Sequence, residues 1–343
     1  MKKLLNTLFV TLPDVRATLE NENVCVKKGN ETLLRVPLLN LEGLALFNYF
    51  GATPQLMGEC AKRNITVSFL NEYGKFIGTF HGETKGNVLL RKEQYRLSDD
   101  TDRSLGFARN FVFGKLHNQK WVLERGLRDN ALRIDAELVQ KESRRITENM
   151  KQALDCEDAA LLRAIEGNAA HSYFIAFDEL ILRNKDEFRL TNRNRRPPTD
   201  PVNALLSFSY TLLANECRHA LECAGLDSYV GFLHTDRPGR ASLALDLMEE
   251  LRPHFADRFA LTLMNLGELT PSDFEAQESG AVLMSDKARK TFLSAWQQRK
   301  KEIVTHPFLK EKMEWGIVPH IQALLLSRAI RGDLDQYPPF LWK

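Results

Sequence analysis

Short runs of apolar and β-branched residues, separated by turn residues, fill most of the first eighty positions of the chain. Residues 24–26 and 33–36 flank one turn, and residues 65–70 and 75–80 flank another turn at 71–74. Short runs of this kind joined by turns that contain Gly and Asn are typical of β-hairpins. We therefore predict a β-rich N-terminal region.

One helix is predicted within this region, and helices dominate the chain after it. An N-cap residue followed by proline predicts helix starts at Thr53-Pro54 and at Asp200-Pro201. In the later part of the chain the apolar period lengthens to about 3.6 residues, which is typical of amphipathic helices. The main interruption is a proline-rich segment at 193–201. We predict a β-rich domain at 1–90 and a helical domain at 91–343.

The composition is that of an ordinary globular protein and excludes several classes. The chain has 343 residues and a formal net charge of +2, which argues against disorder and against a wholly basic nucleic-acid coat. Its five cysteines include no C-x-x-C pair, so neither a disulfide framework nor a zinc ribbon is expected. The apolar runs are far shorter than the ~18 residues of a membrane span. We expect no leader peptide, no membrane contact and a cytoplasmic location.

The segment 241–253 carries the first candidate residues for chemistry. Its pattern predicts a helix that ends near Pro253, with Asp246, Glu249 and Glu250 inside an arc of about 100°. Carboxylates at positions i and i+3 can converge on one cation. The alternative is the solvated acidic face of an amphipathic helix.

Two further residues extend this candidate site. His234 follows the apolar residues Phe232 and Leu233. The turn after it allows the imidazole to fold back over the acidic helix. A histidine with nearby carboxylates is a donor set suited to Mn²⁺ or Mg²⁺, whereas the alternative is a packed core histidine. Glu166 lies beside an apolar helical stripe, where the alternative is a position at its solvated margin.

Missing motifs narrow the chemistry further. The chain contains no G-x-x-x-x-G-K-[ST], G-x-G-x-x-G, H-E-x-x-H or G-x-S-x-G sequence. ATP hydrolysis and a nucleotide cofactor are therefore unsupported, and metal-assisted chemistry remains.

Basic residues cluster in two segments that suit the binding of phosphates. The first cluster precedes the proline-rich segment at 193–201 and includes its first residues, and the second surrounds Trp296. The candidate DNA-binding residues are Arg193, Arg195, Arg196, Lys287, Arg289 and Lys290. The alternative is two solvated helix faces, with Arg196 paired to a carboxylate such as Asp200 instead of a phosphate.

Three long strings give the chain a resemblance to a known family. They are IEGNAAHSYF at 165–174, RPPTDPVNALLSFSYTLL at 196–213 and GFLHTDRPGRASLALDLMEELRP at 231–253. In this order they resemble the CRISPR-associated spacer-acquisition integrase, the first numbered CRISPR-associated protein. The match covers essentially the whole chain, and the length resembles the type I-C branch of the family.

The resemblance implies a fold, a site and partners. The implied fold is α+β, with a β-sandwich-like N-terminal dimerisation domain followed by an all-α C-terminal catalytic domain. Glu166, His234 and Glu249 match the metal ligands of the family, and Asp246 matches a further catalytic carboxylate. The family forms homodimers, bridged by a small ferredoxin-like second CRISPR-associated subunit. It inserts short double-stranded DNA into the repeat array.

We therefore expect a DNA integrase or endonuclease that depends on Mn²⁺ or Mg²⁺ and joins a 3′-OH to a phosphodiester of the array. Two alternatives remain open. One is a nuclease or branched-junction resolvase that uses water as the nucleophile with the same residues. The other is a DNA-binding scaffold without catalysis, in which the carboxylates are structural. A strand-joining assay separates them.

Overall fold

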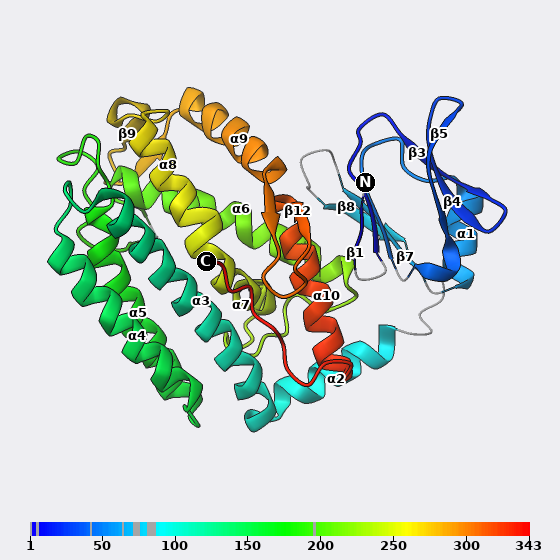
Figure 1. Cartoon of the computed structure of the whole chain (residues 1–343), viewed down its shortest axis with the longest axis horizontal. Helices are drawn as coiled ribbons and strands as arrows, with labels where there is room; N and C mark the ends of the chain where they lie inside the picture. The colour runs from blue at the N-terminus through cyan, green and yellow to red at the C-terminus, as the bar shows by residue number, and fades with distance from the viewer. Residues whose placement is uncertain are drawn as a thin grey trace.

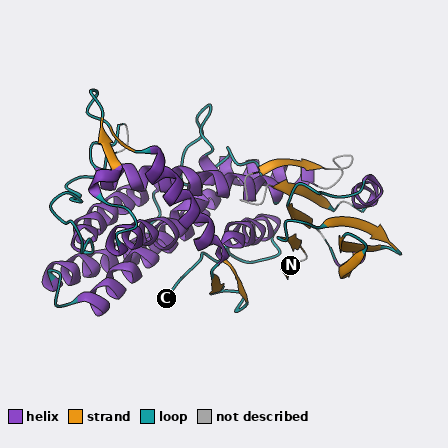
Figure 2. Ribbon diagram, turned by 90° about the horizontal axis from the view of Figure 1, so that it is seen from above, coloured by secondary structure: helices purple, strands orange, loops and turns teal. Residues whose placement is uncertain are grey.

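A strand-rich N-terminal region lies at one end of the molecule, and a mostly helical region makes up the rest (Figure 1; Figure 2). The α+β fold class is therefore confirmed. The computed structural model describes residues 2–4, 7–41, 43–63, 65–70, 76–80, 87–194 and 197–343. The predicted turn at 71–74 and two predicted DNA-binding residues, Arg195 and Arg196, lie outside the described residues.

The N-terminal region contains two sheets. The five-stranded sheet has the order β1-β2-β6-β7-β8, in which β2 is parallel to β6 and β6 is parallel to β7. Its strands are β1 (Lys2–Leu4), β2 (Thr7–Val10), β6 (Gly43–Phe47), β7 (Thr66–Leu70) and β8 (Phe76–Phe80). The three-stranded antiparallel sheet consists of β3 (Arg16–Glu20), β4 (Asn23–Lys28) and β5 (Glu31–Pro37). The predicted strand pairs β4–β5 and β7–β8 are confirmed.

Alternating apolar residues bury both faces of the five-stranded sheet. Leu8 and Val10 pack into a core shared with the three-stranded sheet. Phe9, which lies between them in β2, and Phe47 of β6 belong to the core of the helical region. Both rings contact His320 edge-on, at 5.9 and 5.6 Å between ring centroids. Successive side chains of a strand point to opposite faces, so strands buried on both sides are apolar throughout. The sheet therefore joins the two regions.

Two helices begin at the caps that the sequence predicts. Thr53 Oγ1 accepts a hydrogen bond of 3.3 Å from the Leu56 N–H at the start of α1 (Pro54–Lys62). Asp200 Oδ1 accepts one of 2.8 Å from the Asn203 N–H at the start of α6 (Pro201–Cys223). These bonds satisfy N–H groups that have no partner inside the helix, so the local sequence is sufficient to set both starts.

Helices α3, α4 and α5 lie side by side, and α3 also packs against α7 (Figure 1). Besides α6, the helices of this region are α2 (Asn87–Asp99), α3 (Thr101–Asn130), α4 (Ala136–Leu154), α5 (Ala159–Glu179), α7 (Ser242–Leu251), α8 (Arg258–Leu266), α9 (Asp286–Lys301) and α10 (Val318–Arg331). Short 3₁₀ segments occur at Leu38–Asn40, Pro271–Asp273 and Trp315–Ile317. No helix in the described part of the chain is long and apolar enough to cross a membrane.

Two small hairpins accompany these helices and were not part of the all-α expectation. They are formed by β9 (Phe274–Ala276) with β10 (Val282–Met284), and by β11 (Ile303–Thr305) with β12 (Lys312–Glu314). Both lie at the edges of the helical region (Figure 2). The predicted domain boundary after residue 90 falls within α2 and stays a prediction.

Helix α7 ends at Leu251, close to Pro253 as predicted, but the chain stays helical beyond it, which was not predicted. Helix α7 continues through a π-helical segment, Arg252–Asp257, directly into α8. Proline has no N–H for the carbonyl four residues earlier, but the wider π turn accommodates this without ending the helix. Such π turns often occur at functional sites.

The last residues of the chain cross α3, where one buried asparagine holds them. Asn118 Nδ2 donates to the carbonyl oxygens of Glu250 and Phe340, each at 2.6 Å. Asn118 Oδ1 accepts from the Trp342 N–H at 2.9 Å. One side chain of α3 thus links α7 to the C-terminal segment.

We expect Asn118→Ala to lower the unfolding free energy by about 2 kcal/mol, because it leaves buried backbone groups without partners. For a chain of this size the melting temperature should fall by roughly 3 °C. Calorimetry measures this, with Asn149→Ala as a control, because Asn149 makes an exposed bond within α4. Equal melting temperatures for the two variants would contradict the linking role of Asn118.

Candidate active site

Helix α7 buries all three of its acidic residues. The exposed fractions are 0% for Asp246, 3% for Glu249 and 0% for Glu250, so the alternative of a solvated acidic face is wrong. The helix packs between α3 and α6, and every residue from Ser242 to Leu251 is buried except Leu245. Buried carboxylates are costly unless they are paired and hydrogen-bonded, so the partners of each one define the site.

Asp246 holds the loop that carries His234. Its Oδ2 accepts from the N–H groups of Phe232 and Leu233, at 2.7 and 3.0 Å. Its Oδ1 accepts from the His234 N–H at 3.0 Å and lies 2.7 Å from Nδ1 of the imidazole. The predicted folding of His234 back over the acidic helix is therefore confirmed. Gly231 is needed here, because an added Cβ would lie 2.9 Å from Asp246 Oδ2.

The orientation of the imidazole follows from this contact. With Nδ1 directed at Asp246, the Nε2 of His234 lies on the far side of the ring, and it makes no hydrogen bond within the described part of the chain. Burial alone would lower the pKa of His234, but the hydrogen bond and the charge of Asp246 outweigh it and raise the pKa above 6.5.

Helix α2 ties the same loop from the other side. Gln94 Nε2 donates to the carbonyl oxygens of Asp227 and Val230, at 2.8 and 3.0 Å. Ser98 Oγ donates to the Gly231 carbonyl at 2.8 Å. The loop is thus held at both of its faces, by α2 and by Asp246. The sequence gives no local signal for this contact, which joins residues more than 130 positions apart.

Glu249 meets two cations. Lys115 Nζ of α3 lies 2.7 Å from Oε2, and Arg252 lies 3.1 Å from Oε1. Burial raises the pKa of Glu249, but Arg252, Lys115 and His234 lower it further, to about 2. Glu249 is therefore a carboxylate in the folded chain at neutral pH.

Glu166 of α5 shares the same lysine. Lys115 Nζ donates to Glu166 Oε1 and is paired with Glu249 at the same time. The side chains of Lys115 and Glu249 are 5% and 4% exposed, and that of Glu166 is 25% exposed. The expected position of Glu166 at the solvated margin of the apolar stripe is thus correct in part. The side chain is partly exposed to solvent, while one carboxylate oxygen is paired with the buried Lys115 ammonium.

Sequence reasoning did not identify Lys115 or Arg252 as parts of the site. The available signal was a lysine within the apolar stripe of α3, a position that is normally apolar. Arg252 lies in the segment 241–253, in which only the carboxylates were considered as site residues. Both are buried cations whose role becomes visible only when α3, α5 and α7 come together.

A cavity of about 430 Å³ adjoins these residues. It is lined in part by Lys115, Glu166, Arg193, Tyr210, Arg252 and Asp257. The guanidinium groups of Arg193 and Arg252 lie over the Tyr210 ring, at 5.1 and 4.7 Å from its centroid. Tyr210 Oη donates to Asp257 Oδ1 at 2.5 Å, and burial raises the pKa of Asp257 to about 6. The side of the cavity formed by Arg193, Tyr210, Arg252 and Asp257 is therefore polar and hydrogen-bonded.

Glu250 points away from the other two carboxylates. Its Oε1 accepts from Tyr337 Oη at 2.6 Å and from Gln322 Nε2 at 2.7 Å. Its Oε2 accepts from the Phe340 N–H at 2.9 Å. Burial raises its pKa to about 7, although these hydrogen bonds oppose the shift. Glu250 therefore attaches α7 to α10 and to the C-terminal segment.

The donor set suits a divalent cation, although the arrangement is currently one of ion pairs. In the described part of the chain no three His, Cys, Asp or Glu side chains are arranged to hold a metal ion as they stand. However, Glu166 and Glu249 converge on one cation, the Lys115 ammonium. His234 adds a ring nitrogen oriented by a carboxylate, which is the usual arrangement for a histidine ligand. Oxygen ligands with one imidazole suit Mn²⁺ or Mg²⁺.

The predicted DNA-binding residues fall into two situations. Arg193 packs into the protein, with Nη1 donating to Asn203 Oδ1 at 2.6 Å. Lys287, Arg289 and Lys290 lie exposed on α9, where Arg289 pairs with Asp286 at 3.1 Å.

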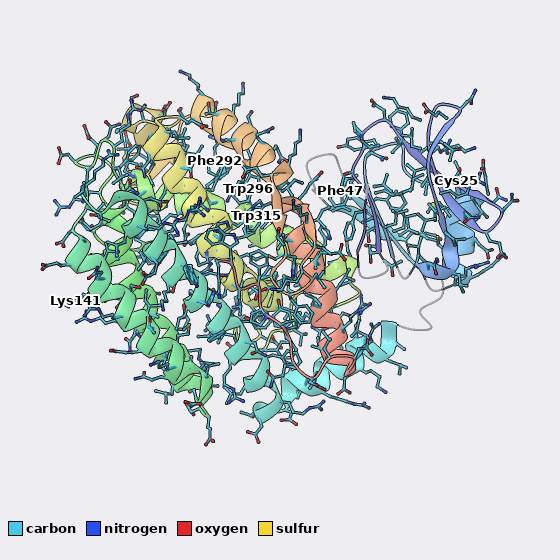
Figure 3. All side chains as sticks on the ribbon, viewed as in Figure 1. Cys25, Phe47, Lys141, Phe292, Trp296 and Trp315 are labelled. Atoms are coloured by element: carbon cyan, nitrogen blue, oxygen red, sulfur yellow. The ribbon has the colours of Figure 1, made fainter. Side chains whose placement is uncertain are left out.

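The remaining part of the second basic cluster is structural. Trp296 is 1% exposed and stacks with Phe292 in the aromatic core beside Trp315 (Figure 3). Its Nε1 donates to Glu216 Oε1 at 3.0 Å, and Lys300 pairs with the same oxygen. Trp296 therefore offers no ring face for stacking on a base.

Comparison with known sequences identifies the family. The model of the family "CRISPR associated protein Cas1" matches residues 8–298. CRISPR-associated endonuclease Cas1 1 of Chlorobaculum tepidum is 46% identical over 343 residues, and CRISPR-associated endonuclease Cas1 2 of Rhodospirillum rubrum is 46% identical over 347 residues. Both comparisons cover the whole of each chain. The chain belongs to the Cas1 family.

Solved structures share the fold. A Cas1 protein from Thermotoga maritima superimposes with a TM-score of 0.75 at 22% identity, over 98% of this chain and 97% of that one. A casposase bound to its integration product gives a TM-score of 0.80 at 20% identity, over 99% of this chain and all of the other. The N-terminal strand-rich region followed by helices is therefore the fold of this family.

Family membership settles the class of activity. The relatives that match over the whole chain are named CRISPR-associated endonucleases, so the prediction of an enzyme of the nuclease class is confirmed and the scaffold alternative is not supported. None of these relatives is named by subtype, so the type I-C branch stays a prediction.

We expect Asp246→Asn to lower the pKa of His234, because burial then acts without the charge that opposes it. A raised histidine pKa stabilises the fold fully below pH 6.5, and this contribution is lost as the pH rises through the raised value. The stability deficit of the variant should therefore be larger near pH ~5.5 than near pH ~8.5.

NMR titration of the imidazole and urea unfolding at both pH values measure the two effects. His306, whose pKa burial lowers to about 4, serves as the internal control and should titrate unchanged. An unchanged pKa of His234 in the variant would show that Asp246 does not control this ring.

Proposed function

We propose that the chain is a metal-dependent integrase that inserts short double-stranded DNA into a CRISPR repeat array by transesterification. The observation that carries the proposal is the convergence of Glu166 and Glu249 on one buried cation beside a histidine oriented by Asp246. Membership of the Cas1 family supports it, and so does the fold shared with a casposase bound to its integration product.

The residues that would hold the metal are Glu166, His234 and Glu249. A bound Mn²⁺ or Mg²⁺ would polarise the scissile phosphate and stabilise the leaving oxygen. In the reaction, the 3′-OH of the incoming strand loses its proton and its oxygen forms a bond to a phosphorus atom of the repeat. The bond from this phosphorus to its old 3′-oxygen breaks, and the released oxygen takes up a proton to become a new 3′-OH. One phosphodiester replaces another, so no ATP is required.

The chain's own residues prepare this exchange. Asp246 keeps His234 in one orientation through Nδ1, and Glu249 is ionised because Arg252 and Lys115 face it. The adjoining cavity brings Arg193 and Arg252 to one side of the site, where positive charge suits a phosphate. Asp246, with both oxygens engaged by the histidine loop, is proposed as a positioning residue.

The N-terminal region is proposed as the homodimer interface. It carries exposed apolar side chains that a monomer would leave in water, namely Leu39, Tyr49, Phe50 and Ile77 at 87%, 75%, 59% and 55% exposure. A protein-contact surface in this region would remove these side chains from water. A ferredoxin-like second CRISPR-associated subunit is proposed to bridge two dimers. The fold shared with a chain of a partial Cas6-RT-Cas1–Cas2 complex, at a TM-score of 0.74, supports this.

The deciding experiment combines a labelled duplex fragment, a plasmid with a repeat array, and Mn²⁺ or Mg²⁺, with and without the bridging subunit. Covalently joined product supports the integrase. Cut plasmid without any joined product would support the nuclease or junction resolvase instead.

We predict that Glu166→Ala, His234→Ala and Glu249→Ala each reduce strand joining by at least about 100-fold, because each removes one of three proposed ligands. Glu148→Ala, at an exposed position of α4, is the matched control. Circular dichroism verifies folding. A folded variant that joins DNA at the wild-type rate would remove that residue from the proposed ligand set.

Exposed positive charge on α9 is predicted to bind the DNA backbone. Replacing Lys287, Arg289 and Lys290 with Gln should weaken duplex binding equally for all sequences and lower the salt slope by about 0.9 per lost phosphate contact. Fluorescence anisotropy over a salt series measures the slope.

The control for this prediction removes the same charge elsewhere. Lys141, Arg144 and Lys151 are exposed on α4, with Lys141 at the outer surface (Figure 3). If the control triple variant lowers the salt slope as much as the α9 variant, the effect is one of net charge and α9 is not the contact surface.

A further inference from the structure

The Lys115 ammonium stands at the point where the two proposed ligand carboxylates meet. The side chain comes from α3, pairs with Glu166 of α5 and Glu249 of α7, and is 5% exposed. A lysine that is almost fully buried requires such partners, since its charge is otherwise too costly. The protein therefore carries a cation of its own inside the proposed metal site.

This lysine keeps the site assembled when no other cation is present. Two carboxylates from separate helices repel each other at close range, and without a shared cation they separate or take up a proton. Two acidic groups, Glu166 and Glu249, face two basic groups, Lys115 and Arg252. These four groups are thus electrically balanced as they stand.

A divalent cation disturbs this balance. If it bound with Lys115 in place, four positive charges would face two carboxylates. The ammonium also lies at ion-pair distance from both carboxylates, where an ion held by both would lie. Both the charges of these groups and the position of the ammonium therefore favour movement of the lysine when a metal enters.

Building on the proposed metal site, we propose that Lys115 is a resident counter-cation that holds Glu166 and Glu249 together in the metal-free chain and withdraws along α3 into the adjacent cavity when a divalent cation binds. Lys115 is then a positioning residue, and metal binding is an exchange of one cation for another.

The structure contains a second place for the displaced ammonium. Gln119 lies one helical turn further along α3, on the same face as Lys115, and both line the cavity of about 430 Å³. Gln119 is 2% exposed, and its Oε1 has no hydrogen-bond donor among the described residues. A buried acceptor without a donor is rare in folded proteins, and an ammonium group supplies three donors. The displaced lysine would satisfy it.

The first test measures Mn²⁺ binding by calorimetry on protein freed of metal, at a pH near 8. Lys115→Met should bind Mn²⁺ at least tenfold more tightly than the wild-type chain, because the metal no longer displaces a cation. Its metal-free form should also melt at a lower temperature. Arg252→Met is the matched control, since it removes a buried cation that touches the same Glu249 at the other oxygen. It should tighten binding less than threefold, and Lys141→Met should change nothing.

Two outcomes of this comparison would overturn the proposal. One is a folded Lys115→Met chain whose Mn²⁺ affinity is unchanged or weaker. The other is an equal gain in Arg252→Met, which would show a general effect of charge. Glu249→Ala separates these from a failure of the metal site itself: if it binds Mn²⁺ as the wild-type chain does, the proposed function loses its metal ligand.

A second test follows the lysine in the wild-type chain and holds even where Lys115→Met does not fold. A buried, paired ammonium exchanges its protons slowly, so its ¹H–¹⁵N signal remains visible when the signals of surface lysines are lost. Lys115→Arg assigns the signal. Mg²⁺ should shift it, and Gln119→Leu should weaken Mg²⁺ binding about threefold or more. A signal that stays in place at saturating Mg²⁺ would overturn the proposed withdrawal.

Discussion

Three buried carboxylates on one helix are the constraint on which the catalytic region depends. A carboxylate removed from water must gain an opposite charge, gain hydrogen bonds or take up a proton. Helix α7 uses all three solutions. Asp246 accepts backbone N–H groups of the histidine loop, Glu249 faces two cations, and Glu250 is hydrogen-bonded with its pKa raised to about 7. Each solution recruits a different part of the chain.

The surrounding architecture follows from these partners. Glu249 draws α3 toward α7, Asp246 anchors the loop of His234, and Glu250 attaches α10 and the C-terminal segment. Helix α2 holds the same loop from outside. Two of the proposed ligands, Glu249 and His234, therefore come from a helix and a loop that are fixed on several sides. Such fixation is what a site needs to hold reacting groups within fractions of an ångström.

Features set by neighbours in sequence were predictable, and features set by distant contacts were not. The hairpins and the caps at Thr53 and Asp200 depend on a few adjacent residues, and the structure has them where the sequence predicts them. The end of α7 close to Pro253 was predicted, but its continuation was not, because a proline normally stops a helix and here a π-helical segment continues it.

The candidate site divides in the same way. The helical pattern at 241–253 predicted that the three carboxylates of α7 share one face. The apolar residues before His234 and the turn after it predicted that this loop folds back over the helix. The pattern could not show that Glu250 turns to the C-terminal segment, nor that a lysine within an apolar stripe is the partner of Glu166 and Glu249. Both facts depend on helices more than 50 positions apart in the chain.

The approach of α3 to α7 is finally set by one glycine. Gly114 directly precedes Lys115, and a Cβ at this position would lie 2.9 Å from the Cβ of Pro339 and 3.0 Å from the Cβ of Glu250. Real Cβ atoms essentially never come closer than 3.0 Å to their neighbours, so any larger residue would push α3 away from α7 and from the C-terminal segment. The Lys115 ammonium can lie between carboxylates of two other helices only because its own helix comes this near. The charge balance of the site thus depends on the absence of a side chain at the neighbouring position.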